Sequence, residues 1–162
     1  MQDMLKGLLL PLRDRSAEYL ESELEIQTKI QGVSSKIFTN PTSIKNSSLL
    51  ATTGSIEVYV AMGYDGTLFE EIVKIFLQGD EVEGEELIEI KESISCELIN
   101  IIVGNAIKNP IDNTSLNITP PLYIDEMSSV FKDKNSKILT TNIETIYGNI
   151  YIAITHPFKK SF

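Results

Sequence analysis

The chain has 162 residues, a net charge of -9, one cysteine and one histidine, and these properties exclude several classes of protein. Cys96 alone cannot form an intrachain disulfide, and the two residues together are too few for a Cys/His metal cluster. The negative net charge disfavours nucleic-acid binding, which requires clustered Lys and Arg. No stretch approaches the ~20 apolar residues that cross a bilayer, and residues 8–12 are too short for a signal-peptide core. We therefore expect a single domain over residues 1–162, in the cytoplasm and away from membranes.

The first half of the chain alternates between helical and strand-like patterns. Apolar residues recur on one face of residues 12–26, which predicts a helix with Pro11 near its first turn and Gly32 beyond its end. A possible short strand at 33–39 and a loop at 40–48 follow. A strand at 49–52 then precedes the clearest alternation in the chain, in which Ile56, Val58, Val60 and Met62 share one face.

The second half predicts two further helices and then strands. Residues 67–78 form an amphipathic helix with Gly79 at its end, and residues 85–108 form a long helix that stops before Pro110. Residues 116–124 are a strand that Pro120 and Pro121 shorten, break or confine to an edge. Residues 137–145 and 149–155 form a hairpin around Tyr147-Gly148-Asn149. We expect an α+β fold, with two long helices packed on an antiparallel or mixed β-sheet.

The helix predicted over residues 85–108 carries a narrow polar strip. At about 100° per residue, Ser93, Glu97, Asn100 and Gly104 fall within an arc of about 60°. Glu86 and Glu89 extend this arc toward the N-terminus of the helix. Most of the remaining circumference is apolar, so we expect the helix to be buried over most of its surface, with only the polar strip facing water.

Two interpretations of the polar strip are open at this point. Polar residues opposite an apolar face are ordinary on any surface helix. However, Asn and Gly in mid-helix cost about 0.5 and about 1 kcal/mol relative to Ala, and neither residue fills a core gap here. Gly104 allows close approach of another backbone, either from a partner or from a neighbouring element of this chain.

The segment around the polar strip resembles the phosphatase signature of the CheC/CheX/FliY group. Residues 93–106 read SISCELINIIVGNA, with Ser93 followed by Glu four residues later and Asn three residues after that. The signature continues with a proline some twenty residues on, a position that Pro120 or Pro121 fills at slightly shorter spacing. The Gly-Asn-Ala that follows is similar to CheX, and the order of predicted elements also resembles CheX through nearly the whole chain. CheC proteins carry two such helices and this chain has one, which favours CheX.

The resemblance implies a function and a set of site residues. A CheX-like protein dephosphorylates the aspartyl phosphate of a CheY-type response regulator. Asn100 would position the attacking water, Glu97 would contact the active-site lysine of the regulator, and Ser93, Glu89 and Gly104 would contact the partner. The chain would need no cofactor or metal of its own, because the Mg²⁺ belongs to the regulator. The alternative is a non-catalytic docking module on the same scaffold, in chemotaxis or flagellar-switch signalling.

Two further expectations concern assembly and the neighbours of the strip. The resemblance implies a homodimer formed by joining sheets, and residues 149–155 contain few of the Lys or Pro residues that protect an exposed edge. Asn105 falls toward the apolar side of the helix, where we expect a buried hydrogen bond. Cys96, at the margin of the strip, is interpreted as a small hydrophobic residue.

Overall fold

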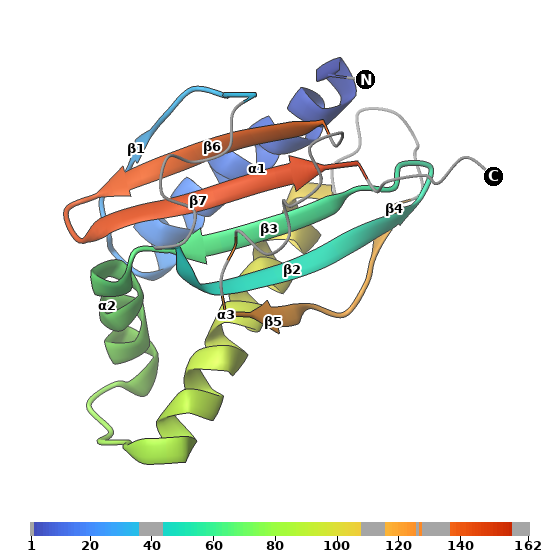
Figure 1. Cartoon of the computed structure of the whole chain (residues 1–162). Coiled ribbons are helices and arrows are strands. Elements are labelled where there is room, and N and C mark those ends of the chain that lie inside the picture. The colour runs from blue at the N-terminus through green and yellow to red at the C-terminus, as the bar shows by residue number, and fades with distance from the viewer. Residues whose placement is uncertain (1, 36–43, 108–115, 126, 128–136, 157–162) are drawn as a thin grey trace.

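The α+β fold class is confirmed. The computed structural model describes residues 2–35, 44–107, 116–125, 127 and 137–156, which form three helices and seven strands (Figure 1). The elements are α1 (Gln2–Glu23), β1 (Lys29–Ile30), β2 (Lys45–Gly54), β3 (Tyr59–Tyr64), α2 (Gly66–Leu77), α3 (Gly84–Ile107), β4 (Leu116–Ile118), β5 (Leu122–Ile124), β6 (Ile138–Thr145) and β7 (Gly148–Thr155).

The described strands form one antiparallel sheet. Their order is β1-β6-β7-β3-β2-β4, with β5 also paired to β2, and every described pairing is antiparallel. β7 therefore lies inside the sheet, bonded to β6 on one side and β3 on the other. The expectation that residues 149–155 form an exposed edge is wrong, because the strands on both sides of β7 satisfy its backbone groups.

Two helices cover one face of the sheet. α1 and α3 contact each other, and they pack behind β6 and β2 respectively in the view of Figure 1, while α2 lies beyond one end of the sheet. The main core fills the space between these layers, and its most deeply buried members include Leu5, Leu9, Met62, Leu68, Ile99, Ile143 and Ile152. Val58, Val60 and Met62 are all in this core, as their alternation predicts. On the opposite face of the sheet, Ile44, Ala61 and Met127 form a second, smaller cluster.

α1 begins ten residues before the predicted helix, and Pro11 lies inside it rather than in its first turn. A proline inside a helix costs about 3 kcal/mol or more. Leu5, Leu9 and Leu12 are at most 2% exposed, and burial of each leucine contributes about 1.5–3 kcal/mol, which offsets the proline. The helix also ends before Gly32. Glu23 is its last residue, and Glu25 turns the chain with a φ of 56°.

The predicted loop at 40–48 is also partly wrong. Residues 36–43 lie outside the described part of the chain, but β2 already begins at Lys45. Its first residues resemble a loop because they are polar, yet Ser47 and Ser48 are fully buried. Ser48 Oγ donates a hydrogen bond to the carbonyl of Ser95 on α3, 3.1 Å away. Of the strand expected at 33–39, the described residues include only a bridge between Ser34 and Thr140.

Other predicted boundaries are confirmed. Gln78 and Gly79 follow α2 with φ angles of 49° and 91°, the left-handed geometry expected after a helix. Pro120 and Pro121 separate two three-residue strands, β4 and β5. The turn between β6 and β7 leads into Gly148, whose φ of 126° favours glycine.

Candidate functional site

The second half of α3 is anchored in the core, and its first half is not. The buried residues of this helix are Ile94, Ser95, Leu98, Ile99, Ile102 and Val103. None of residues 84–91 is buried, and Ile88 is 58% exposed. The expectation that the helix is buried over most of its surface is therefore correct only from Ile94 onward. Figure 1 gives the reason, because the first turns of α3 extend past the sheet.

Two hydrogen bonds attach the buried face of α3 to β2. Ser95 Oγ donates to the carbonyl of Asn46 at 2.8 Å, and Ser48 Oγ donates to the carbonyl of Ser95 at 3.1 Å. Both serines are fully buried, so breaking either bond would leave a polar group without water. Together with the apolar contacts of Leu98 and Ile102, these bonds fix the rotation of α3 about its axis. The opposite side of the helix is thereby held toward solvent.

The polar strip lies on that solvent side. Ser93, Glu97 and Asn100 are exposed, Gly104 is half-buried, and Glu89 is exposed on the projecting half of the helix. Within the described residues, the side chains of Glu97 and Asn100 make no hydrogen bond or ion pair. A Cβ on Gly104 would meet no described atom within 4 Å outside the helix. In the described part of the chain, Gly104 is thus not explained by close packing against a neighbouring element.

Two tyrosines from distant segments lie near α3. Burial first, and then the charges of Glu23 and Glu97, raise the pKa of Tyr19 on α1 above its ordinary value. Burial, followed by the charges of Asp125 and Glu92, raises the pKa of Tyr123 on β5. Both phenols are therefore protonated at neutral pH and are able to donate hydrogen bonds.

Cys96 is half-buried, and its thiol stays protonated at neutral pH. Burial and, to a smaller extent, the charge of Glu92 raise the pKa of this thiol. A protonated thiol is a poor nucleophile, which agrees with the interpretation of Cys96 as a small hydrophobic residue.

Sequence reasoning placed Asn105 wrongly and did not find Tyr19 or Glu23. Asn105 is exposed, because Ile102 and Val103 make the apolar contacts of this turn of α3. The Asn105 side chain instead lines a concave surface between α3 and α1. Tyr19 comes within the field of Glu97, and Glu23 lines a concave surface with Asn105, only because α1 packs beside α3. No local pattern indicates that contact, because the two segments are separated by more than seventy residues.

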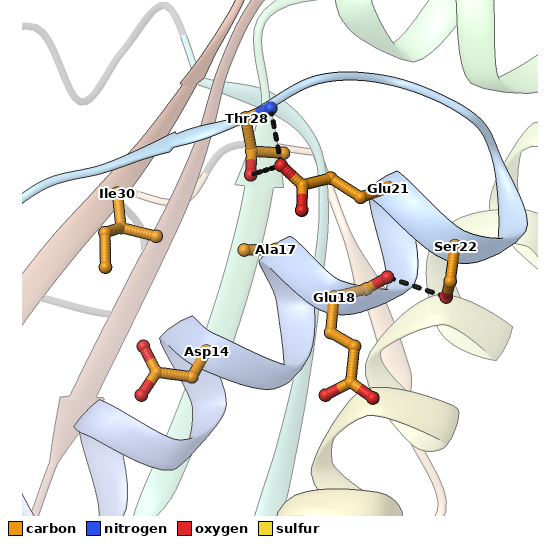
Figure 2. A pocket seen from close by; sticks show the side chains of 7 residues that line it. All are labelled: Asp14, Ala17, Glu18, Glu21, Ser22, Thr28 and Ile30. Carbon is orange, nitrogen blue, oxygen red and sulfur yellow. Dashed lines mark hydrogen bonds between the residues drawn. The ribbon is translucent and has the colours of Figure 1, made fainter.

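A second concave surface lies on the other flank of α1 (Figure 2). It has a volume of about 560 Å³ and is lined by Asp14, Ala17, Glu18, Glu21, Ser22, Thr28 and Ile30. Its carboxylates already have partners. Glu21 accepts hydrogen bonds from the backbone N–H and hydroxyl of Thr28 at 3.2 and 2.9 Å, Asp14 pairs with Arg13, and Glu18 pairs with Arg15. The Glu21–Thr28 bonds hold the connection from α1 to β1, and the two ion pairs lie within α1, so the carboxylates of this surface have structural roles.

The described residues give no indication of a metal centre or a membrane-spanning helix. They contain no group of three or more His, Cys, Asp or Glu side chains placed to hold a metal ion. No helix in the described part of the chain combines the length and apolar character needed to span a bilayer.

The fold and the exposed pair together define a class of protein. An antiparallel sheet that anchors a helix with a solvent-facing Glu-x-x-Asn pair is the arrangement expected of the CheC/CheX/FliY group. The model of the family described as "Chemotaxis phosphatase CheX" matches residues 47–144, which is more than half of the chain. The chain therefore belongs to the CheX family of chemotaxis phosphatases.

Solved structures of this class share the fold at low sequence identity. CheX of Borrelia burgdorferi, solved as a CheX-CheY-BeF3-Mg²⁺ complex, is 20% identical, with a TM-score of 0.74 over 91% of this chain and 96% of that one. CheX of Desulfovibrio desulfuricans is 15% identical, with a TM-score of 0.70 over 91% and 97%. FliY of Thermotoga maritima is 22% identical, with a TM-score of 0.62 over 94% and 88%. Comparison with curated proteins gives no match.

Proposed function

We propose that this chain dephosphorylates the aspartyl phosphate of a CheY-type response regulator, with Glu97 and Asn100 inserted into the active site of the regulator. Membership of the CheX phosphatase family supports the reaction class, and the Borrelia burgdorferi relative, solved with CheY, supports the partner. One observation of the site carries the proposal. Glu97 and Asn100 lie one turn apart on a rigidly anchored helix, exposed and without a polar partner among the described residues.

The chemistry of the reaction suits an amide at position 100. Hydrolysis of a phosphoryl group needs little covalent assistance, so the main task of a helper protein is to hold a water in line with the phosphorus. The Asn100 amide offers a carbonyl acceptor and two N–H donors for that water while remaining uncharged. A carboxylate in this position would be repelled by the phosphoryl dianion.

Glu97 has a different role in this proposal. Its carboxylate, one helical turn before Asn100, would pair with the active-site lysine of the regulator and fix the register of α3 in the complex. Ser93, Glu89 and Gly104 would form the surrounding contacts, with Gly104 allowing the partner backbone to approach. The chain would supply no cofactor, and the Mg²⁺ would remain bound to the regulator.

The decisive measurement is the lifetime of a phosphorylated CheY-type regulator with and without this protein. We expect the parent protein to shorten the lifetime, and Asn100→Ala to lose about 10²- to 10³-fold of that acceleration. The variant should still bind the regulator, and its free energy of unfolding should change by no more than about 0.5 kcal/mol. Glu70→Ala, at an exposed helical position on α2 outside the sheet edges, is the control and should act like the parent.

Three outcomes would contradict the proposal in different ways. If Asn100→Ala dephosphorylates at the parent rate, Asn100 does not position the water. If Asn100→Ala unfolds the protein, its amide is structural. If the parent protein binds the phosphorylated regulator without shortening its lifetime, the chain is a docking module on the same scaffold.

We also propose that the protein forms a homodimer by pairing the edge strands of its sheet. These are β1 on one side and β4 and β5 on the other, where Leu122 is 63% exposed. Pairing two such edges would satisfy their backbone groups and cover Leu122. Light scattering should give twice the monomer mass at micromolar concentration, and a monomeric mass at high micromolar concentration would contradict this assembly.

A further inference from the structure

A groove lies between α1 and α3, on the flank of α3 that faces α1. Its volume is about 410 Å³. Its lining includes Arg15, Glu18, Tyr19 and Glu23 from α1, and Ile102 and Asn105 from α3. Ile102 forms an apolar wall, because it is 2% exposed and belongs to the main core. The groove therefore combines this apolar wall with polar side chains.

The groove and the polar strip are both on α3, where Gly104 and Asn105 are consecutive residues. Asn105 lines the groove, Gly104 precedes it on the strip, and a Cβ on Gly104 would meet no described neighbour within 4 Å. Tyr19 connects the two surfaces electrostatically, because it lies in the field of both Glu23 and Glu97. A partner that reaches Glu97 and Asn100 is thus brought next to this groove.

The charges of the groove are unbalanced. Arg15 Nη1 lies 2.6 Å from Glu18 Oε2, so the cation of the groove is already neutralised. Glu23 forms no ion pair within the described residues. Tyr19 also lines the groove, and its aromatic ring attracts cations over its face. The unpaired carboxylate of Glu23 and the aromatic ring of Tyr19 together offer a binding site for a long basic side chain.

We infer that this groove receives a lysine or arginine of the response regulator, from the surface that surrounds the regulator's own active site. The inference rests on the proposed function, which brings the regulator to the polar strip. Tyr19 and Glu23 are then specificity-determining contacts that act outside the reaction centre. They select regulators that carry a basic residue at the matching position.

The test uses a CheY-type regulator that binds the parent protein. The regulator is activated with BeF3⁻ and Mg²⁺, and its affinity for Glu23→Lys is measured. At low ionic strength, we expect about tenfold weaker binding, because like charges then meet in the groove. The loss should shrink as added salt shortens the range of the interaction from ~30 Å at 0.01 M toward ~3 Å at 1 M. Glu70→Lys, an exposed position on α2, makes the same change in net charge and should bind within about twofold of the parent.

A second pair of variants separates the inference from the proposed function. If Glu97→Lys abolishes binding while Glu23→Lys behaves like Glu70→Lys, the groove is not a contact and the proposed function stands. If Glu97→Lys also binds like the parent, the proposed function fails as well. Circular dichroism should show that each variant is folded. If Glu23→Lys is not folded, Glu23→Gln keeps the shape and removes the charge, and equal binding by that variant would overturn the inference.

Discussion

The buried and exposed faces of α3 both carry serine, but the surroundings of the two serines differ. Ser95, on the face toward β2, is fully buried and takes part in hydrogen bonds through both its hydroxyl and its carbonyl. Ser93, two residues earlier, is exposed on the polar strip with Glu97 and Asn100. No described side-chain hydrogen bond or ion pair involves these three residues.

This difference separates structural from functional polar residues. A buried polar group must find its partner inside the chain, because an unsatisfied group costs about 1–3 kcal/mol. An exposed group has water as a partner and is free to exchange it for another protein. The polar residues of the buried face therefore keep α3 in place, and those of the exposed face are available to a regulator. Four predictions examine this distinction.

The largest expected effect is on stability, at the buried face. Leu98 is 2% exposed, and Leu98→Ala should lower the free energy of unfolding by about 2–5 kcal/mol because it leaves a cavity between α3 and the sheet. Glu97→Ala, at the adjacent exposed position, should change it by no more than about 0.5 kcal/mol. Urea unfolding of the two variants measures both values, and equal losses would show that the two faces are not distinct.

The second prediction concerns binding at the exposed face. Glu97→Lys should weaken the complex with an activated regulator by about 100-fold or more, because it places a cation opposite the lysine of the regulator. Its unfolding curve should match that of the parent protein. Unchanged affinity would remove Glu97 from the interface.

The third prediction compares two serines on the same helix. Ser95→Ala removes the donor to Asn46 and should cost about 1–3 kcal/mol of stability, since the Asn46 carbonyl loses its partner away from water. Ser93→Ala should stay within about 0.5 kcal/mol. Thermal unfolding of both variants provides the comparison, and a larger loss in Ser93→Ala would reverse the assignment of the two faces.

The smallest effect is expected at Gly104. Gly104→Ala should stabilise the fold by about 1 kcal/mol, because alanine favours the helix and its Cβ meets no described atom. The same variant should bind the regulator more weakly, since the added methyl group keeps the partner backbone at a distance. Gly63→Ala is the contrasting control, because its Cβ would collide with Ile44 and Ser47 and destabilise the protein. Stronger regulator binding by Gly104→Ala would exclude close backbone approach at this position.

Local patterns in the sequence were sufficient to predict features that depend only on neighbouring residues. The strip of Ser93, Glu97 and Asn100 follows from the 3.6-residue repeat alone, and the structure places all three on the solvent side of α3. The β6–β7 hairpin and the end of α2 were also predictable, because Gly148 and Gly79 occupy turns that need a positive φ. Each of these features depends on residues within a few positions of one another.

Tertiary contacts decided the features that depend on distant segments. Pro11 is inside α1 because the leucines around it are buried against the sheet. Ser47 and Ser48 belong to a strand because the carbonyl of Ile44 accepts a hydrogen bond from Ser47, and the carbonyl of Ser95 on α3 accepts one from Ser48. The position of β7 inside the sheet and the placement of Tyr19 near Glu97 likewise depend on packing between distant parts of the chain. The physical reason is that burial is a property of the assembled core. A local pattern specifies which face of an element is apolar, and only the folded chain determines what covers that face.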